Sequence, residues 1–568
     1  MATQEVKKIK KAKKPIKIWK SILGVIFAVL AVMLGYLLYW SQDVFGDIPF
    51  AQVLFHLMVP LKGADNDIVA SYFEGVMPYV TVMVAYLLVI FLPDIMDGYY
   101  AWKKKLKEKK QNVETVDVET VNVETVNAVA VDDDVVVEKE KASVKKENLF
   151  NKIVKAVIEG VCIVRRLFTR YFLSISSLAL VIVIVVDIFG FHIDEWLADR
   201  FDSSTIFEDY YVDAAEAKIT APENGKKKNL IFILCESLEA SFADVASGGC
   251  MNENLIPNLT NMANENTHFS TKENLAGAIE VEGTGWTIAA MVAQLSGVPM
   301  MTPMGQNGYE GYAKFLPGLT SLGELLEKQG YVNEVMLGSY KHFAGVDTYF
   351  EQHGNYEIFD YSTAVEYDYI DQDYFRFWGF EDDKLLQYAK TEIDKLEATG
   401  KPFNLLINTI DLHTTSGYTC ERCGTKYSEK YKNVINCQDA LIYEFVEWCK
   451  TQDFYEDTVI VVGGDHLSMA PIVKNEFVPK GYDRSTYHVI INSDLEPTNA
   501  ENRLFTTMDM YPTILASLGF KIEGERLGLG TNLYSDKKTV MEEVGKEYFM
   551  EEISKNSILY NEDILGTK

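Results

Sequence analysis

The chain has 568 residues, of which 48% are hydrophobic, so it is long enough for more than one structural unit and a large buried core. Its formal net charge of −28 argues against nucleic acid as a partner, because nucleic-acid binding needs a basic surface. Seven cysteines are too few for a scaffold built from disulfide bonds.

Three predominantly apolar runs lie in the first third of the chain, and each approaches the roughly 20 residues that a membrane helix needs. No small-residue cleavage site follows the first run, so we interpret it as a retained span. Basic clusters lie before the first run and between the second and the third, which predicts a multi-pass protein of the cell membrane with a cytoplasmic N-terminus. Everything after about residue 195 is then extracellular or periplasmic. The three predicted spans are 21–39, 76–92 and 171–191.

Between the second and third spans, residues 103–170 are predicted to form a cytoplasmic linker. Three Val-Glu-Thr-Val repeats over 113–127 are too short to bury a core of their own. We therefore divide the chain into a membrane region at 1–195, an outer linker at 196–228 and a large outer domain at 229–568.

From Asn229 onward, short apolar strands alternate with amphipathic helices. This alternation predicts an α/β domain with a mostly parallel central sheet flanked by helices. Sheets of this kind bind their ligands at the carboxyl ends of the strands. The predicted strands are 229–234, 404–410 and 458–462, and the predicted helices are 257–265, 320–329, 381–398 and 434–451.

Acidic and imidazole side chains follow these three strands. Glu236 follows the first strand, His413 comes after the second, and Asp465 and His466 follow the third. If the strands are parallel neighbours, these side chains converge on one edge of the sheet, where carboxylates and imidazoles would hold a divalent metal ion. Taken singly, each residue also has an ordinary interpretation as a turn cap or a loop histidine.

A glycine-punctuated turn, Gly283-Thr284-Gly285-Trp286-Thr287, leads into a helical pattern that ends near Gly297. A hydroxyl group at the start of a helix lies among free backbone N–H groups and at the positive end of the helix dipole, which suits contact with a phosphate. Thr287 begins the helix and is therefore preferred over Thr284 as a nucleophile. Coordination to a metal ion would lower the pKa of its hydroxyl enough for attack on phosphorus.

Together these phrases resemble the sulfatase-like phosphoglycerol transferases of the alkaline phosphatase superfamily, which include lipoteichoic acid synthases and periplasmic glucan phosphoglycerol transferases. The resemblance covers roughly residues 229–535. It implies that Thr287 is the covalent nucleophile and shares one metal ion with Glu236, Asp465 and His466. Mn²⁺ is the metal implied first, with Mg²⁺ and Zn²⁺ as alternatives. The further matching phrases are Cys235-Glu-Ser-Leu-Glu239, Trp378-Gly-Phe-Glu-Asp382 and Arg526-Leu-Gly-Leu-Gly-Thr-Asn-Leu533.

The resemblance also implies a function and roles for further residues. Glycerophosphate would move from phosphatidylglycerol in the lipid bilayer to a glycan or polyglycerolphosphate acceptor, by way of a phospho-threonine intermediate. His413 would contact the substrate phosphate or protonate the leaving alkoxide. Lys341 and His342 lie in a loop that resembles a substrate loop of the family, with an exposed surface loop as the alternative.

Two other functions stay open at this point. The first is a phosphoethanolamine transferase, or a phosphodiesterase or sulfatase-like hydrolase, of the same superfamily. Sulfate-ester hydrolysis fits less well, since sulfatases proper use a cysteine or serine matured to formylglycine in this turn, and no cysteine stands at 283–290. The second is a catalytically silent membrane scaffold, which the intact set of candidate residues argues against.

Cys420-x-x-Cys423 and Cys437 allow two interpretations. No fourth ligand follows at zinc spacing, and a domain outside the cell would be oxidised, so we expect a disulfide from Cys420 or Cys423 to Cys437. Asp509 is interpreted as a structural turn residue that could also support the site.

Overall fold

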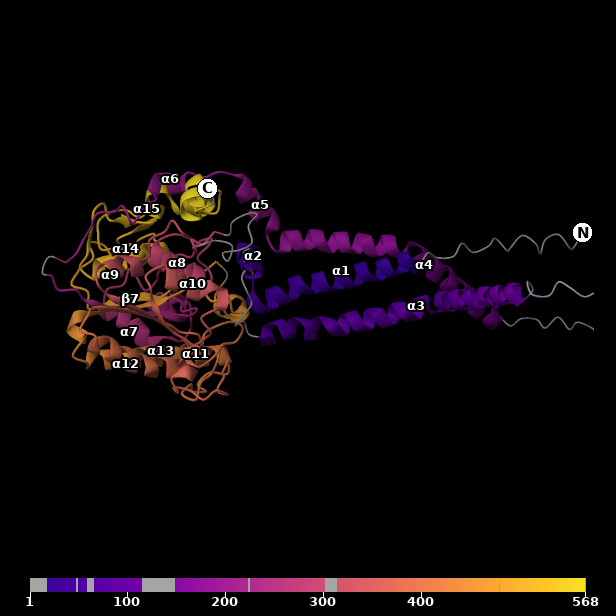
Figure 1. Ribbon diagram of the computed structural model, residues 1–568, viewed down its shortest axis with the longest axis horizontal. Coiled ribbons are helices and arrows are strands. Elements are labelled where there is room, and N and C mark those ends of the chain that lie inside the picture. Colours follow the sequence, from indigo (N-terminus) through magenta and orange to yellow (C-terminus); the bar gives the residue numbers. More distant parts are fainter. Residues whose placement is uncertain are drawn as a thin grey trace, which may run out of the picture. The chain divides into compact units, whose positions relative to one another are not determined.

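The computed structural model describes residues 18–46, 50–58, 66–114, 149–222, 225–301, 314–479 and 481–566 (Figure 1). Most of the Val-Glu-Thr-Val repeats at 113–127 lie outside these ranges. The chain divides into two compact units. One comprises residues 1–37 and 70–187, and the other comprises 38–69 and 188–568.

Three long helices contain the predicted membrane spans, namely α1 (Ile18–Phe45), α3 (Asn66–Glu114) and α4 (Leu149–Gly190). Each has a stretch that is long and apolar enough to cross a membrane. The helices extend beyond the predicted spans, and α3 and α4 enter the segment expected as a linker. The residues that follow the second span, such as Lys103–Lys110, are good helix formers, so the helix continues past the apolar run.

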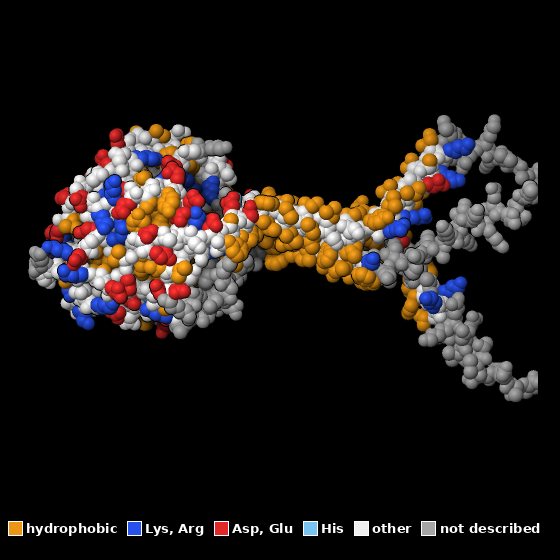
Figure 2. All heavy atoms as spheres, turned by 90° about the horizontal axis from the view of Figure 1, so that it is seen from above, with side chains coloured by type: hydrophobic (Ala, Val, Ile, Leu, Met, Phe, Trp, Pro, Cys, Tyr) orange, Lys and Arg blue, Asp and Glu red, His pale blue; other side chains and the backbone are white. Residues whose placement is uncertain are grey.

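The first unit has a small core, in which Leu87, Phe91 and Phe172 are buried together. Nearby, Arg165 donates one hydrogen bond to Asp94 (2.5 Å) and another to the carbonyl oxygen of Ile90 (2.8 Å). The outward surface of the long helices consists largely of apolar side chains, which Figure 2 shows in orange. An apolar surface of this extent is unfavourable in water, which supports membrane anchoring by these helices.

The second unit contains a six-stranded sheet whose strands have the order β4-β3-β5-β2-β6-β7. Every neighbouring pair is parallel except β6 and β7, which are antiparallel. The α/β prediction is therefore confirmed, and the strands predicted at 229–234, 404–410 and 458–462 are adjacent in the sheet. The strands are β2 (Asn229–Cys235), β3 (Val332–Leu337), β4 (Glu357–Phe359), β5 (Phe403–Asn408), β6 (Thr458–Gly464) and β7 (His488–Ile491).

Helices cover both faces of this sheet, because alternate side chains of each buried strand point to opposite sides (Figure 1). On β2, Phe232 belongs to one hydrophobic cluster and Ile233 to the other. The first cluster includes residues of α8 (Thr287–Ser296), α9 (Leu322–Lys328) and α14 (Met510–Ser517). The second includes residues of α7 (Pro257–Glu265), α12 (Asp382–Ala398) and α13 (Lys430–Lys450).

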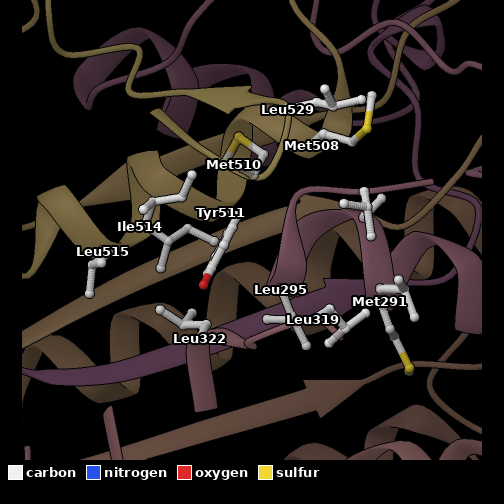
Figure 3. Packing of buried hydrophobic residues seen from close by; sticks show 14 of the residues in the cluster. Met291, Leu295, Leu319, Leu322, Met508, Met510, Tyr511, Ile514, Leu515 and Leu529 are labelled. Carbon is white, nitrogen blue, oxygen red and sulfur yellow. The ribbon is translucent and has the colours of Figure 1, made fainter. Parts of the chain in front are cut away.

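Helix α8 is held by the first cluster, which Figure 3 shows from close by. Met291 and Leu295 of α8 are buried together with Tyr511 and Ile514 of α14. Each such side chain contributes about 1.5–3 kcal/mol when it is fully buried. The helix ends at Ser296 and is followed by Gly297, whose φ of +69° favours a glycine. This packing fixes the start of α8, and therefore the position of Thr287.

The segment 196–228, expected as an outer linker, carries short elements that join the second unit. Phe207 is buried, and its ring centroid lies 5.0 Å from that of Tyr560. The short strand β1 (Ile219–Thr220) pairs with β8 (Lys521–Ile522). A few apolar residues within a polar stretch are enough to anchor it.

The remaining elements are α2 (Phe50–Met58), α5 (Ile193–Phe201), α6 (Ile206–Tyr210), β1 (Ile219–Thr220), α10 (Val346–Gln352), α11 (Tyr361–Glu366), β8 (Lys521–Ile522), β9 (Arg526–Leu527), β10 (Gly530–Thr531), α15 (Val540–Val544) and α16 (Lys546–Ile553).

Candidate active site

Three of the predicted metal ligands meet at the carboxyl ends of β2 and β6. Glu236, Asp465 and His466 are completely buried, and their potential ligand atoms all lie within 4.8 Å of one another. His466 Nε2 is 3.6 Å from a carboxylate oxygen of Glu236 and 3.4 Å from Asp465 Oδ2. The three side chains therefore surround one small volume at the edge of the sheet.

Backbone groups hold these side chains in place. Asp465 Oδ1 accepts hydrogen bonds from the backbone N–H groups of Ser237 and His466, each at 2.7 Å. The backbone N–H of Glu236 donates to the hydroxyl of Thr409 (3.0 Å). Ser237, with φ of +53°, turns the chain sharply after β2, and its hydroxyl donates to Glu236 Oε1 (2.6 Å). The strand ends thus arrange the carboxylates before any ligand binds.

The arrangement of free atoms fits a metal ion. His466 Nδ1 is 2.9 Å from the carbonyl oxygen of Leu467, which fixes the ring so that Nε2 faces the two carboxylates. His466 Nε2 and Asp465 Oδ2 are buried and have no hydrogen-bond partner. Leaving such atoms unpaired costs about 1–3 kcal/mol each. A divalent cation between these groups would satisfy both atoms, so the site residues fit a divalent metal ion.

The pKa values of Asp465 and His466 also favour a bound cation. Burial raises the pKa of Asp465 to about 7, with the charge of Glu236 adding to the shift and His466 opposing it. Burial works to lower the pKa of His466, but Asp465, Glu236 and Glu280 together raise it to about 9. Without a cation, the cluster therefore holds protons near neutral pH that a metal ion would replace.

Thr287 lies next to this cluster. It is the first residue of α8, and its hydroxyl donates to Glu236 Oε2 at 3.3 Å. Trp286 before it is extended and makes no side-chain cap on the helix, so backbone N–H groups at the helix start remain available to a ligand. Thr284 is fully buried, and its hydroxyl donates to the carbonyl oxygen of Val281 (2.8 Å) within the turn. The geometry thus separates the two threonines, and Thr287 is the one beside the predicted ligands.

Two glycines of the turn, Gly283 and Gly285, lie where a larger residue would be strained or crowded. Gly283 has φ of +78°, which favours glycine. A β-carbon on Gly285 would lie 3.0 Å from Glu280 Oε1, so a side chain at this position would press on that carboxylate. Beside the turn is a pocket of about 250 Å³ whose lining includes Glu280, Glu282, Gly285, Trp286 and Arg484.

Sequence reasoning missed the charged residues that line or adjoin this pocket. Glu280 accepts a hydrogen bond from the backbone N–H of Leu467 (2.7 Å), so it supports the loop that carries His466. Arg484 pairs with Glu239 and donates to the carbonyl oxygen of Ser468 (2.7 Å). Burial raises the pKa of Glu282 to about 7. Glu239 stands inside a phrase that carries the family resemblance, and Glu282 directly precedes the glycine-punctuated turn. Neither residue directly follows a predicted strand, so the sequence does not mark its position.

His413 lies outside the group of Glu236, Asp465 and His466. It is half-buried in the loop after β5, where its ring centroid is 4.6 Å from that of Trp378 and 6.4 Å from that of Phe377. The loop is held by Asp382, whose carboxylate accepts from the backbone N–H groups of Ile410 (2.8 Å) and Asp411 (2.9 Å). The sequence identified Trp378 only as part of a phrase that resembles the family, and it did not predict the contact with His413.

Lys341 and His342 lie in a loop after β3 and are paired with acidic side chains. Lys341 Nζ is 3.4 Å from Glu351, and His342 Nδ1 is 2.5 Å from Asp347. The next residue, Phe343, packs against Trp378 with 5.3 Å between ring centroids. The loop is therefore linked to His413 through Trp378.

Two further expectations concern structural residues. Asp509 accepts from the backbone N–H groups of Thr506 (2.7 Å) and Thr531 (2.8 Å), as a turn residue does. Cys423 and Cys437 form a disulfide, while Cys420 is a free thiol.

Comparison with known proteins finds two similar relatives that share a name. Phosphoglycerol transferase I of Salmonella choleraesuis (strain SC-B67) is 32% identical over 346 residues, which cover 59% of this chain and 42% of that protein. The protein of the same name from Xanthomonas axonopodis pv. citri (strain 306) is 32% identical over 323 residues, which cover 55% of this chain and 43% of that protein. The match thus spans less than half the length of these relatives.

Two solved structures are also similar, with low sequence identity. The lipoteichoic acid synthase LtaP from Listeria monocytogenes has a TM-score of 0.44 and 17% identity, covering 56% of this chain and 79% of that chain. The lipooligosaccharide phosphoethanolamine transferase EptA from Neisseria meningitidis has a TM-score of 0.41 and 12% identity, covering 88% of this chain and 84% of that chain. A family model described as Sulfatase matches residues 228–520, more than half of the chain, and the chain therefore belongs to the sulfatase family.

Proposed function

We propose that this chain is a membrane-anchored phosphoglycerol transferase that moves glycerophosphate from phosphatidylglycerol to an acceptor hydroxyl outside the cell. The observation that carries the proposal is the position of Thr287, whose hydroxyl lies at the start of α8 and 3.3 Å from Glu236. The similarity to two proteins named phosphoglycerol transferase I supports the choice of the transferred group.

In this proposal Glu236, Asp465, His466 and Thr287 hold one divalent cation, Mn²⁺ first, with Mg²⁺ and Zn²⁺ as alternatives. The buried atoms of Asp465 and His466 that lack hydrogen-bond partners support this ligand set. When bound, the cation would lower the pKa of the threonine hydroxyl and neutralise charge on the phosphoryl oxygens.

The chain's own residues then carry the transfer in two steps. Thr287 Oγ1 gives its proton to Glu236 Oε2, to which it donates a hydrogen bond, and forms a bond to phosphorus. The bond from phosphorus to the diacylglycerol oxygen breaks, and the leaving alkoxide takes a proton. We assign that proton to His413, whose ring packs on Trp378. In the second step the acceptor hydroxyl gives its proton to His413 and attacks phosphorus. The bond from phosphorus to Thr287 Oγ1 breaks, and this oxygen takes its proton back from Glu236.

The substrates follow from the surroundings of the site. The three apolar helices would bring the domain to the bilayer, where the headgroup of the donor lipid lies. We propose that the N-terminus is cytoplasmic and that the 188–568 part faces outward. The acceptor would be a glycan or a polyglycerolphosphate chain, with the pocket beside Gly285 and Trp286 open to its hydroxyl. Lys341 and His342 would exchange their acidic partners for the glycerol phosphate.

The test uses the full chain in detergent or nanodiscs with labelled phosphatidylglycerol and Mn²⁺. We expect release of diacylglycerol that stops when EDTA is added and that is lost in Thr287→Ala. Release that survives Thr287→Ala would contradict the assignment of the nucleophile. Turnover of phosphatidylethanolamine alone would point to a phosphoethanolamine transferase, and an inactive but folded protein would point to a scaffold.

A further inference from the structure

The loops that follow β5 and β6 are joined by a buried side chain, that of Tyr431, the second residue of α13. Its hydroxyl donates a hydrogen bond to the carbonyl oxygen of Leu412 at 2.8 Å, and Leu412 directly precedes His413. The same hydroxyl is 2.8 Å from the hydroxyl of Ser468, which lies two residues after His466. One phenol group therefore contacts both loops of the candidate active site.

The number of hydrogens fixes the direction of these bonds. A phenol has one hydrogen, which Tyr431 donates to Leu412, so Ser468 is the donor of the bond between the two hydroxyls. The Ser468 oxygen in turn accepts from the backbone N–H of Ala470 (3.3 Å). Burial raises the pKa of Tyr431, so the phenol keeps its proton. A continuous series of hydrogen bonds thus runs from the loop after β6 to the residue before His413.

The loop after β6 is held at Ser468 by charged side chains. The backbone N–H of Ser468 donates to Glu239 (2.8 Å), and its carbonyl oxygen accepts from Arg484 (2.7 Å). Glu239 is completely buried and also accepts from Arg484 Nε (3.0 Å). Hydrogen bonds to charged groups are stronger than those between neutral groups. The Ser468 hydroxyl therefore projects from a firmly held backbone.

The loop after β5 receives the other end of the series. Asp382 accepts from the backbone N–H of Asp411 (2.9 Å). Tyr431 acts one residue farther along, at Leu412, and its bond is therefore adjacent to His413 in the chain. Loss of the Tyr431 hydroxyl should loosen this loop more than the loop after β6, whose backbone keeps its bonds to charged groups.

We propose that Tyr431 is a positioning residue for His413, because its hydroxyl ties the loop after β5 to the firmly held loop after β6. The proposal rests on the proton transfer that the proposed function assigns to His413. A general acid or base must stay within hydrogen-bond reach of the reacting oxygen. A looser loop lowers the fraction of molecules in which His413 meets this condition. Tyr431 itself gives no proton to the substrate, since its hydrogen is donated to Leu412.

The first test compares loop opening in the full chain and in Tyr431→Phe, both in nanodiscs, by hydrogen exchange with mass spectrometry. The backbone N–H groups of His413, Gly417 and Tyr418 donate to carbonyl oxygens within the loop after β5, so their exchange reports its opening. We expect exchange to be about fivefold faster in the variant, the factor that one ordinary hydrogen bond provides. Mn²⁺ affinity, measured by isothermal titration, should stay within about twofold, as expected for an independent site.

Tyr487→Phe is the matched control. Tyr487 is fully buried in the same hydrophobic cluster as Tyr431, and its hydroxyl donates to the carbonyl oxygen of Leu259 in α7 (2.7 Å). The control therefore loses the same kind of bond at a place away from the two loops. Exchange in the loop after β5 should be unchanged in it. Equal acceleration in the two variants would mean a general loosening of the core and would overturn the proposal.

The second test asks whether Tyr431 acts through His413. Tyr431→Phe should lower kcat for diacylglycerol release about fivefold, in line with the lost hydrogen bond, and leave KM for phosphatidylglycerol unchanged. In a chain that already carries His413→Gln, the added Tyr431→Phe should lower kcat no further, because residues that act as a unit are not additive. An equal loss in both backgrounds would overturn the positioning role.

The two tests fail separately from the proposed function. If the unmodified chain releases no diacylglycerol from phosphatidylglycerol, the proposed function fails and the role of His413 fails with it. The exchange experiment needs no turnover, so loop opening that is the same in Tyr431→Phe and in the unmodified chain would overturn the link between the loops by itself.

Discussion

The ends of β2 and β6 differ from the end of β5, although the three strands are parallel neighbours in one sheet. Glu236 and Asp465 follow the last residues of β2 and β6 directly and are completely buried. The last residue of β5 is Asn408, so His413 does not follow its strand directly. Its side chain is half-buried against Trp378. One edge of the sheet therefore carries side chains that are positioned in two different ways.

The difference shows how far a sheet can position a side chain. A residue directly after a parallel strand is still held by the ladder, as Asp465 is when its N–H donates to the carbonyl oxygen of Cys235 (3.0 Å). A residue farther along depends on the loop, which here is tied down by Asp382. Rigid positions suit metal ligation, whereas a loop histidine suits proton transfer to a substrate.

The largest effect is expected from Thr287→Ala, because this change removes the proposed nucleophile. Transferase activity should fall roughly a thousandfold or more, as happens when a covalent catalyst loses its attacking group. Initial rates of diacylglycerol release measure it. Thr284→Val is the matched control, since it removes the other hydroxyl of the turn. It should cost about 1–3 kcal/mol of stability and leave the activity per folded molecule largely unchanged.

The second largest effect concerns the candidate metal ligands at the ends of β2 and β6. Asp465→Asn can keep the hydrogen bonds from Ser237 and His466 at Oδ1 but replaces Oδ2, the atom without a partner, by an amide nitrogen. Mn²⁺ affinity should fall by more than about a hundredfold, since losing a group that merely supports a ligand already costs about 10–100-fold. Isothermal titration measures the affinity. Mn²⁺ binding as tight as in the unmodified chain would remove Asp465 from the ligand set.

The third effect distinguishes His413 from the candidate metal ligands at the ends of β2 and β6. His413→Gln should lower kcat by about 10²- to 10⁴-fold, the usual contribution of a general acid or base, without changing Mn²⁺ affinity. Steady-state kinetics and metal titration on the same preparation measure both quantities. A parallel loss of metal binding would mean that His413 belongs to the metal site after all, and the contrast between the strand ends would disappear.

The smallest effect concerns the support of the β5 loop. Burial raises the pKa of Asp382 from its ordinary value of 3.8 to about 7. The folded chain therefore holds a proton here that the unfolded chain has lost, so stability decreases as the pH rises between these values. Asp382→Asn cannot ionise, and its stability should decrease less steeply from pH 5 to pH 8 in thermal unfolding. An equally steep decrease in the variant would show that Asp382 does not contribute.

The sequence predicts much of this architecture. Strands such as 229–234 are short apolar runs, and a parallel sheet brings their ends together, so Glu236, Asp465 and His466 could be placed side by side without coordinates. The position of Thr287 at a helix start follows from the glycine pattern. These features are local in sequence or follow from one topological rule.

Other features depend on distant contacts and could not be predicted. Glu280 and Arg484 reach the site by hydrogen bonds to the loop after His466, and no local pattern marks such a pair. The packing of Trp378 on His413 joins two separate loops. Phe207 anchors a segment whose overall composition is that of a linker. Tertiary packing decides each of these positions.

The most direct test of the central claim is to trap the covalent intermediate. The full chain with Mn²⁺ and phosphatidylglycerol, without an acceptor, is quenched in acid, digested and analysed by mass spectrometry. We predict one glycerophosphoryl group on Thr287, absent from Thr287→Ala and present in Thr284→Val. Turnover with no adduct on any residue, or an adduct on Thr284 in place of Thr287, would contradict the account.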